Sequence, residues 1–259
     1  MKKDTLTITI IGHNESHHLK ELLPQLQWAD EIIYVDCESD DESLEVAQQL
    51  GCKTFRRPNL SNLNVNKSFA IEQATGDWIF YLDPDERIPE ALQQEIQQKI
   101  QSPGKVVAFS LNRRNFYFGR WLKHGSQYPD VQLRLFQRGK AFFPNKHVHE
   151  KLQVNGPIGK LRHDMLHFPY QSVSQYLQKF NFYTTFEATY LLQQNISPDV
   201  VLALRFLIFT PLFRFFRRYV LKGGFLDGLP GFFAALFDAL NYVVRYVKLW
   251  ELYHRRNNA

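Results

Sequence analysis

Short apolar segments alternate with helical patterns through the N-terminal part of the chain. The segments with strand composition are residues 5–11, 31–36, 52–56 and 78–83. Leucines at helical spacing follow the first segment, a helix ended by Gly51 follows the second, and helical patterns follow the other two. Strands that alternate with helices predict an α/β fold with a doubly wound, mostly parallel sheet and helices on both faces.

The pattern changes after about residue 105. Residues 105–118 predict another strand, whereas residues 119–170 are rich in glycine, proline, histidine and aromatic residues and predict short strands at best. Residues 172–194 have a helical pattern, and phenylalanines are interleaved with arginines after it. We therefore expect three segments, which are residues 1–110, residues 111–195 and a helical extension, residues 196–259.

The C-terminal extension predicts an amphipathic helix that either lies on a membrane or packs on the rest of the protein. Its apolar stripe consists of Phe232, Phe233, Leu236, Phe237, Leu240, Val243, Val244, Val247 and Trp250. Its N-terminal cations include Arg214, Arg217, Arg218 and Lys222. No stretch reaches the roughly 20 apolar residues of a membrane span. Aromatic and aliphatic residues beside cations suit a helix at the surface of anionic lipid.

Charge and cysteine content narrow the partners and the compartment. A net charge of +5 and a pI of about 9.1 favour phosphorylated ligands, nucleic acid or an anionic membrane. We expect no nucleic acid, because the arginines alternate with aliphatic stretches instead of lining a polar groove. Two cysteines, Cys37 and Cys52, do not make a disulfide framework and indicate a reducing compartment.

Three carboxylates follow two of the predicted strands. Asp36 ends one strand, and Asp83 and Asp85 follow another in the sequence LDPDE. Ligands of doubly wound sheets bind at the carboxyl ends of the strands. Two carboxylates separated by a single residue can hold Mg²⁺ or Mn²⁺, which would also take the oxygens of a diphosphate. The sequence therefore predicts a site for a phosphorylated ligand at this edge of the sheet.

The residues after Asp36 predict a nucleoside site beside the start of a helix. The carboxylate can hydrogen-bond the base or the ribose of a nucleoside. Ser39 and Glu42 form a capping-box pattern that would open a helix running to Leu50. The alternative is that Ser39 and Asp41 serve only as caps of that helix.

Taken in order, these motifs resemble the large inverting GT-A glycosyltransferase family known as family 2. The resemblance covers about residues 5–90 and rests on the order and spacing of WADEIIYVD and NKSFAIEQATGDWIFYLDPDE. With WADEIIYVD, the segments HVHE (147–150) and LKGGFLDGLPGF (221–232) look like the lipopolysaccharide-core branch of the family. The resemblance implies a GT-A fold, and members of that branch add glucose to inner-core heptose.

The resemblance also implies roles for individual residues on the donor side. Glu15 and Asp36 would contact the nucleoside, and Lys67 would lie near the base or the diphosphate. Asp83 would lie near the ribose, and Asp85 would bind the metal ion. These residues are therefore the expected binding site for a nucleotide-sugar donor.

Inverting transfer needs a carboxylate that removes the proton of the acceptor hydroxyl. Family members carry a carboxylate in the acceptor segment, which implies Glu150 as this base, with Asp130 as the second candidate. A single histidine would complete the shell of the Mg²⁺ or Mn²⁺ ion, and the candidates are His149 and His167. A dedicated zinc site in HVHE is a less favoured alternative.

We therefore expect a glycosyltransferase that moves a hexose, glucose from UDP-glucose, with inversion onto a lipid-linked acceptor, the inner-core heptose of lipopolysaccharide. Residues 1–110 would bind the nucleotide sugar, residues 111–195 the acceptor, and residues 196–259 the anionic membrane. The expected location is the cytoplasmic face of the inner membrane of a Gram-negative bacterium, with peripheral attachment.

Two other hypotheses compete with this one. A nucleotidyltransferase would need a glycine-rich phosphate loop after the first strand, where this chain has GHNESHH with a single glycine. A non-catalytic membrane-bound scaffold of the same fold would not need Asp83 and Asp85, and both are present. The alternative that we keep is a non-catalytic or differently specific membrane-associated nucleotide-sugar-binding protein of this fold.

Overall fold

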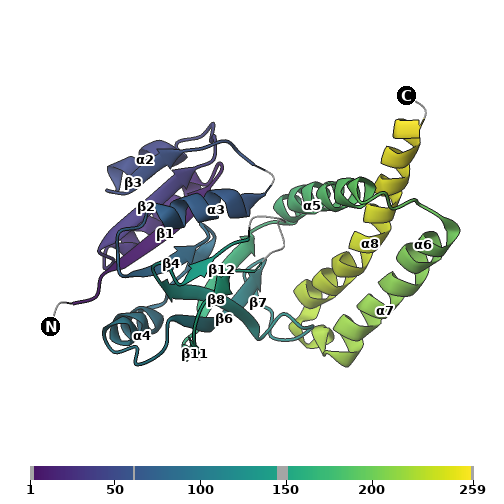
Figure 1. Cartoon of the computed structure of the whole chain (residues 1–259). Helices are drawn as coiled ribbons and strands as arrows, with labels where there is room; N and C mark the ends of the chain where they lie inside the picture. Colours follow the sequence, from purple (N-terminus) through teal and green to yellow (C-terminus); the bar gives the residue numbers. More distant parts are fainter. Residues whose placement is uncertain (1–2, 61, 145–150, 258–259) are drawn as a thin grey trace. The chain divides into compact units, whose positions relative to one another are not determined.

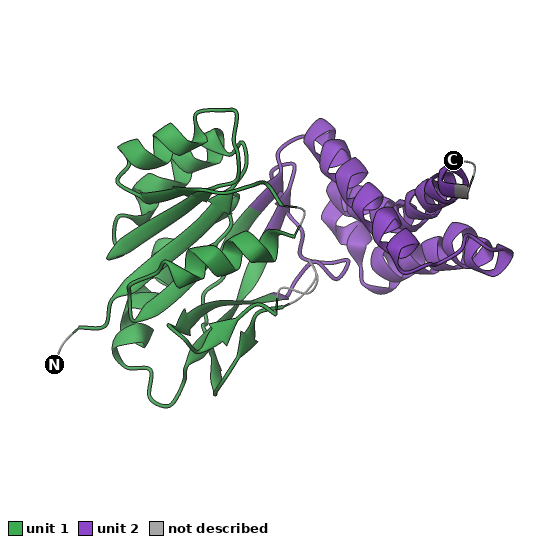
Figure 2. Ribbon diagram, turned by 45° about the horizontal axis from the view of Figure 1, so that its top comes forward, with its two compact units in different colours: residues 1–113, 131–167 green, residues 114–130, 168–259 purple. Residues whose placement is uncertain are grey.

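The computed structural model describes residues 3–60, 62–144 and 151–257, and Figure 1 shows its helices and strands. The chain forms two compact units, which are coloured separately in Figure 2. Unit 1 consists of residues 1–113 and 131–167, and unit 2 consists of residues 114–130 and 168–259. The three segments expected from the sequence are functional assignments, so this division does not decide them.

The central sheet belongs mainly to unit 1. Its strands are β1 (Leu6–Gly12), β2 (Glu31–Asp36), β3 (Lys53–Arg56), β4 (Trp78–Leu82), β5 (Glu86–Arg87), β6 (Ala108–Tyr117), β7 (Arg120–Trp121), β8 (Asp130–Gln137), β11 (Ile158–Lys160) and β12 (Met165–Tyr170). The order along the sheet is β3-β2-β1-β4-β8-β6-β12-β5, with β7 and β11 paired to β6. The strands β3, β2, β1 and β4 are parallel, and β8 runs antiparallel to β4.

Helices cover both faces of this sheet, as the α/β pattern predicts. They are α1 (Ser16–Leu22), the 3-10 turn η1 (Leu23–Leu26), α2 (Ser43–Gln49), α3 (Leu63–Glu72) and α4 (Glu90–Gln101). On one face Ile8 packs in a cluster with Leu19 of α1 and Leu92 of α4, and on the other Ile11 clusters with Ala70 of α3. Every residue of β1 is buried, because a strand inside a doubly wound sheet is covered on both sides. The predicted fold class is confirmed.

Two local predictions are wrong. The region 119–170 contains the eight-residue strand β8 and the six-residue strand β12, not only short strands. Arg134 in β8 and Pro169 in β12 interrupt the apolar pattern that would mark them. The capping box is also absent, because α2 begins at Ser43 and the Ser39 hydroxyl instead accepts the backbone N–H of Asn14 at 2.9 Å.

Unit 1 also contains a small two-stranded sheet. It pairs β9 (Ala141–Phe142) with β10 (Gln153–Val154) in antiparallel register.

Among the described residues, no helix is both long and apolar enough to cross a membrane.

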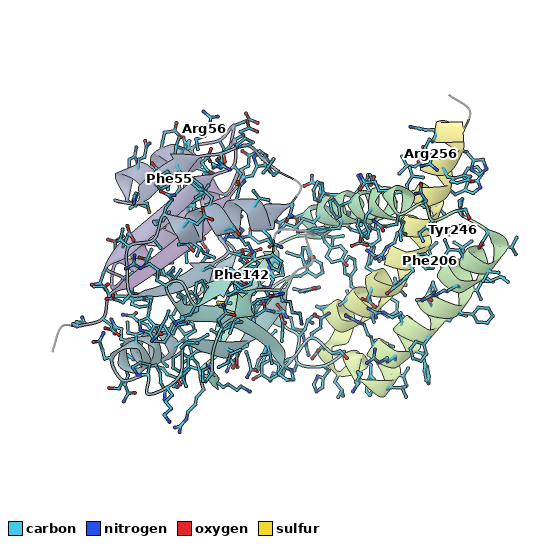
Figure 3. All side chains as sticks on the ribbon, in the orientation of Figure 1. Phe55, Arg56, Phe142, Phe206, Tyr246 and Arg256 are labelled. Carbon is cyan, nitrogen blue, oxygen red and sulfur yellow. The ribbon has the colours of Figure 1, made fainter. Side chains whose placement is uncertain are left out.

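Unit 2 is built from helices, one of which is broken by two π-helical turns. They are α5 (Val173–Gln193), α6 (Val200–Leu204), η2 (Arg205–Phe209), α7 (Thr210–Phe216), η3 (Arg217–Leu221), η4 (Gly224–Asp227) and α8 (Gly228–Asn257). The rings of Phe206 and Tyr246, labelled in Figure 3, are 6.5 Å apart and join η2 to α8. The amine of Lys248 in α8 donates to the carbonyl of Asn181 in α5 at 2.8 Å.

The apolar stripe expected along α8 is partly covered within unit 2. Phe233 and Phe237 stack on each other at 4.3 Å, and Tyr176 of α5 lies 5.2 Å from Phe237. For these two phenylalanines the membrane prediction is therefore wrong, and the alternative of packing within the protein holds. Farther along the helix Val247 and Trp250 remain about half exposed.

The glycine-rich segment 221–232 is a tight corner between η3 and α8. A Cβ atom at Gly231 would lie only 2.1 Å from the carbonyl oxygen of Gly224, so the two backbones touch. The Asp227 carboxylate accepts the backbone N–H and the ring Nδ1–H of His124, at 2.8 and 2.9 Å. These contacts give the LKGGFLDGLPGF motif a structural role.

Candidate functional site

The parallel register brings the predicted carboxylates to one edge of the sheet. Asp36 pairs with Gly12 across β2 and β1, and Leu82 pairs with Ile10 across β4 and β1. Asp83 and Asp85 follow directly after β4. The carboxyl ends of three neighbouring strands therefore meet where the sequence places its acidic residues.

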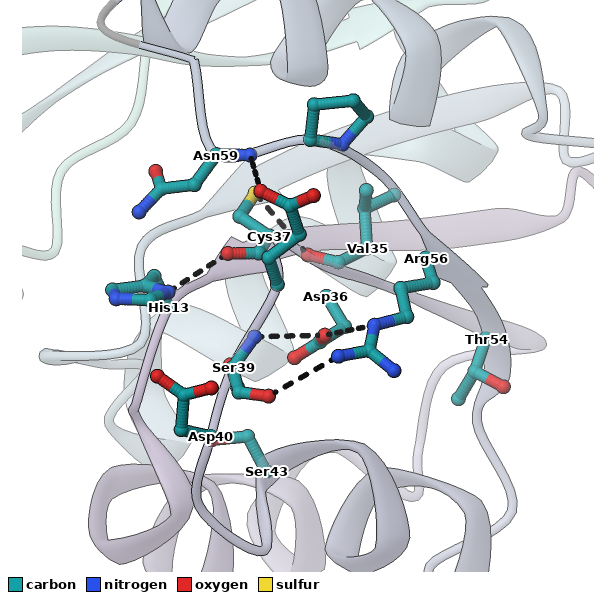
Figure 4. Close-up of polar contacts among 12 residues, drawn as sticks. His13, Val35, Asp36, Cys37, Ser39, Asp40, Ser43, Thr54, Arg56 and Asn59 are labelled. Carbon is teal, nitrogen blue, oxygen red and sulfur yellow. Dashed lines mark hydrogen bonds and ion pairs between the residues drawn. The ribbon is translucent and has the colours of Figure 1, made fainter.

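Asp36 lies at the end of β2 in a web of polar contacts, which Figure 4 shows. Its side chain is 1% exposed, and it accepts the backbone N–H of Ser39 at 3.1 Å. Arg56, at the end of β3, points its Nε toward the same carboxylate at 3.8 Å. The ring of His13 donates from Nδ1 to the carbonyl of Cys37 at 2.8 Å. The loops after β1, β2 and β3 are thus tied together around Asp36.

Glu15 lies beside this web, at the N-cap of α1. Its backbone N–H donates to the Ser43 hydroxyl at 2.8 Å. A Cβ atom at Gly12 would lie 3.1 Å from Cγ of Glu15 and 3.0 Å from the Tyr34 hydroxyl, so the Glu15 side chain covers Gly12. Glu15 and Asp36 therefore occupy the ends of adjacent strands, and their contact with a nucleoside stays a prediction.

Asp83 is the centre of an ion-pair network that joins three elements. Lys67 of α3 lies 2.8 Å from its Oδ1, and Arg134 of β8 lies 2.9 Å from its Oδ2. Arg134 also pairs with the fully buried Glu86, which Arg113 contacts at 2.8 Å. Three cations thus surround these two carboxylates at the edge of the sheet where a phosphorylated ligand is expected.

The cations decide the ionisation of Asp83. Burial by itself raises the pKa of this carboxyl, but the charges of Lys67 and Arg134 outweigh it and hold the pKa well below its usual range. Burial lowers the pKa of Lys67, and Asp83 more than restores it. The stabilisation by Asp83 is present above the ordinary carboxyl pKa of about 3.9 and is lost only as the pH falls through the lowered value.

Asp85 has different surroundings from Asp83. Its Oδ1 lies 3.5 Å from Nε2 of His167, and both side chains are about 15% exposed. The antiparallel pairing of β12 with β5 places His167 opposite Glu86, the residue next to Asp85. His167, the alternative to His149 in the sequence prediction, is therefore the histidine that the structure places beside Asp85.

Of the two candidates for the catalytic base, the structure describes Asp130. Asp130 belongs to unit 2, where it accepts a hydrogen bond from Nδ2 of Asn115 at 3.1 Å. Glu150 and His149 lie outside the described residues. Within the described part of the chain, no cluster contains three or more His, Cys, Asp or Glu side chains that could hold a metal ion.

Sequence reasoning missed Arg134, Glu86 and Tyr81. Arg134 is 2% exposed, and its guanidinium lies 4.1 Å from the centroid of the Tyr81 ring. An arginine between two leucines of a strand was the available signal, since a charged side chain at a buried position requires a partner. The identity of that partner could not be read from the sequence.

The match to known families covers this site. The family model described as Glycosyl transferase family 2 matches residues 7–166 of the chain. The chain belongs to glycosyl transferase family 2. The matched residues contain the whole edge from Glu15 to Asp85 and also reach Arg134.

Relatives within family 2 extend the similarity to nearly the full length. The chain is 28% identical over 254 residues to the lipopolysaccharide core biosynthesis glycosyltransferase LpsC of Rhizobium meliloti (strain 1021). This match covers 95% of this chain and 92% of LpsC. It is also 28% identical over 272 residues to the uncharacterized glycosyltransferase RT0209 of Rickettsia typhi, covering 100% of this chain and 90% of that protein. The predicted family and its lipopolysaccharide-core likeness are confirmed.

A solved structure supports the fold. The mannosyltransferase PcManGT from Pyrobaculum calidifontis, in complex with GDP-Man and Mn²⁺, superposes with a TM-score of 0.55. The match covers 96% of this chain and 88% of that chain, at 11% identity. The likeness confirms the GT-A type of architecture for this family 2 member.

The network predicts that Arg134 is required for stability. In Arg134→Met the buried Glu86 keeps Arg113 as its cationic partner but loses Arg134, so we expect the free energy of unfolding to fall by about 3–5 kcal/mol in urea denaturation of the full chain. The control is Arg138→Met on the exposed end of the same region, which should change it by less than about 0.5 kcal/mol. Adding Glu86→Leu should recover part of the loss. Equal stability of the two single variants would contradict this account.

Proposed function

We propose that this chain transfers glucose from UDP-glucose, with inversion, onto a lipid-linked acceptor, the inner-core heptose of lipopolysaccharide. The observation that carries the proposal is the unequal environment of the two carboxylates after β4. Asp83 is compensated by two cations, whereas Asp85 lies beside a histidine. Binding of a nucleoside diphosphate together with a metal ion would use both environments, Asp83 for the nucleoside and Asp85 for the metal ion.

Asp85 and His167 fit a divalent ion. A carboxylate oxygen and an imidazole nitrogen 3.5 Å apart, on two different elements, can both be ligands of Mg²⁺ or Mn²⁺. Asp83 is less suitable, because Lys67 and Arg134 repel a cation at its oxygens. When bound, the ion would compensate the charge of the leaving nucleoside diphosphate.

The remaining donor contacts come from the same edge. Lys67 and Arg134 keep Asp83 ionised, so that it can accept hydrogen bonds from ribose hydroxyls. Glu15 and Asp36, at the ends of the adjacent strands, would hold the nucleoside. The choice of uridine and glucose follows from the family resemblance, and LpsC, a relative over nearly the whole chain, supports a lipopolysaccharide acceptor.

The acceptor hydroxyl needs a base as it attacks C1 of the sugar. Glu150 is our candidate, with Asp130 as the alternative. Asp130 already accepts a hydrogen bond from Asn115. A carboxylate held in this way has a structural use, which favours Glu150 for proton transfer.

A lipid-linked acceptor requires the enzyme to reach the membrane, and unit 2 offers a surface for this. The outer side of the helical segment from residue 200 to 221 and the corner after it is apolar and exposed, and we call it the uncovered apolar face. It consists of Val200, Val201, Leu204, Leu207, Ile208, Phe209, Leu212, Phe213, Phe216, Val220, Leu221, Phe225, Leu226 and Leu229. An exposed, contiguous apolar face usually marks an interaction site, so this face calls for a partner.

The charge of this segment favours anionic lipid as that partner. Residues 200–226 contain no aspartate or glutamate. Arg205, Arg217 and Lys222 are exposed, whereas Arg214 and Arg218 are ion-paired with Asp238. We propose peripheral attachment through this face, in place of the α8 stripe, at the cytoplasmic side of the inner membrane of a Gram-negative bacterium.

Removal of the metal ligands tests the proposed chemistry. We expect Asp85→Ala to lower transfer by about 10²-fold or more, because the charge of the leaving diphosphate is then uncompensated. His167→Ala should weaken Mn²⁺ binding in the presence of UDP by about tenfold or more, measured by calorimetry. Glu72→Ala, an exposed carboxylate on α3, is the control and should match the unsubstituted chain. Full transfer in excess chelator would refute the metal-assisted reaction.

The base assignment is tested by two isosteric variants. Glu150→Gln cannot accept the proton, so kcat should fall by about 10²–10⁴-fold while the KM for the donor is unchanged. Asp130→Asn should retain most of its turnover in the same steady-state assay. The reverse result would assign the base to Asp130.

Liposome flotation tests the uncovered apolar face. Phe209→Ser combined with Leu212→Ser should reduce binding of the full chain to anionic liposomes by at least about tenfold, because both side chains are about two-thirds exposed and would enter the lipid. The control is Phe142→Ser, an exposed phenylalanine of unit 1, which should float like the unsubstituted chain. Binding should weaken at high salt, since each cation contributes about 1 kcal/mol. Undiminished flotation of the double variant would place the membrane contact elsewhere.

A further inference from the structure

Unit 2 contains a pocket of about 320 Å³ that is separate from the carboxylates after β4 and belongs entirely to this unit. Three arginines, Arg214, Arg218 and Arg245, line it together with the rings of Tyr117, Tyr176 and Tyr242. Its volume lies at the lower end of the range typical of small-ligand sites and suits one or two sugar residues. Aromatic walls with a few charged groups are the usual composition of such sites.

The pocket carries uncompensated positive charge. Asp238 is the only carboxylate that lines it among the described residues. Arg214 binds Asp238 with two hydrogen bonds of 2.8 Å, and Arg218 contacts the same carboxylate at 3.2 Å. Arg245 pairs with Glu187 at 3.3 Å. Three guanidiniums therefore face two carboxylates, and one positive charge remains for a ligand.

Arg218 is the arginine that can bind this ligand. It contacts Asp238 through Nε, and its Nη1 and Nη2 groups have no hydrogen-bond partner within the described parts of the chain. The two terminal nitrogens of a guanidinium form a fork that matches two oxygens of a phosphate or carboxylate. Arg214 satisfies Asp238 by itself, so Arg218 can engage a second anion without leaving a buried charge unpaired.

The aromatic walls of the pocket pack against neighbouring side chains. Tyr176 lies 5.2 Å from Phe237 and 6.2 Å from Phe180, and Tyr242 lies under Arg214 and Arg245 at 5.5 and 5.1 Å. Such rings present flat apolar surfaces beside polar groups, which suits a sugar ring with its apolar and hydroxyl-bearing sides.

The position of Arg218 within its helix links the pocket to lipid. Arg214 and Arg218 lie on the inner side of the segment whose outer side is the uncovered apolar face, with Phe213 and Phe216 among its exposed residues. One helical segment thus has an apolar outer side and a cationic inner side. A molecule with a lipid part and a charged sugar part matches both.

We propose that this pocket binds a phosphorylated sugar of the lipid-linked acceptor. This inference rests on the proposed function for the identity of the acceptor, but the binding itself does not require transfer. Arg218 would hold the phosphate, and the aromatic rings would hold the sugar. The pocket would therefore select acceptors by an anionic group distinct from the hydroxyl that receives the new sugar.

Binding to the full chain in solution tests the pocket directly. The probes are glucose 6-phosphate and glucose, followed by saturation-transfer NMR. We expect the phosphorylated probe to bind at least about tenfold more tightly than glucose, and Arg218→Gln to remove this difference. Arg218→Lys should retain part of it, since it keeps the charge and loses the fork. Arg256→Gln, which removes an exposed arginine of α8, is the matched control and should bind as the unsubstituted chain does.

The outcomes separate this proposal from its alternatives. If Arg218→Gln binds glucose 6-phosphate normally, the proposal is wrong. If it binds the probe normally but loses flotation with phosphatidylglycerol vesicles, the pocket holds a lipid headgroup and the proposal is equally wrong. Circular dichroism must show a folded variant, as expected because Arg214 still pairs with Asp238.

Transfer assays then connect the pocket to the acceptor. Arg218→Gln should raise the KM for a phosphorylated lipid-linked acceptor by about tenfold while hydrolysis of the donor without acceptor is unchanged. The difference between the two proteins should vanish with a phosphatase-treated acceptor. An equal defect with both acceptors would overturn the proposal. Absence of transfer from every donor, with probe binding as expected, would refute the proposed function and leave the pocket as a site for phosphorylated sugars.

Discussion

The pairing of Asp83 with Lys67 and Arg134 is the interaction on which the proposed donor site, at the carboxyl ends of the parallel strands, depends. It joins α3, β4 and β8, three elements far apart in the sequence, at the point where the parallel strands end. A carboxylate so close to the core would be costly as an anion without these partners, and two cations would be equally costly without the carboxylates. The same ion pairs therefore hold α3, β4 and β8 together and position the charged groups of the site.

Asp83 and Asp85, which only Pro84 separates, have different charged neighbours and therefore different proposed roles. Asp83 is neutralised by the protein itself, whereas Asp85 lies beside His167, with which we propose that it binds a metal ion. The proposed metal site and the proposed site for the diphosphate would thus lie within a few residues of each other without their charges cancelling.

Unit 2 also contains a carboxylate that compensates neighbouring charges unequally. Asp238 compensates Arg214 completely and Arg218 only in part, so one helix has an inner side with spare positive charge. Its outer side is apolar and exposed, because α8 covers this segment from one side only. An acceptor that is part lipid and part charged sugar would use both sides, which is why we regard the two surfaces as one functional region.

The sequence by itself determined the fold class, the family and the edge at which the carboxylates gather. Strand and helix periods, together with the rule that parallel strands end at a common edge, depend on local patterns that a sequence displays directly. It also indicated that residues 196–259 form an amphipathic, helical extension. Only the tertiary structure decided which residues meet. Arg134 and His167 reach Asp83 and Asp85 through the pairing of β8 with β4 and of β12 with β5, and such pairings join distant segments that no spacing reveals. The same holds for α8, where an apolar stripe describes equally well a helix on lipid and a helix on α5, and only the packing of Phe233 and Phe237 distinguishes them.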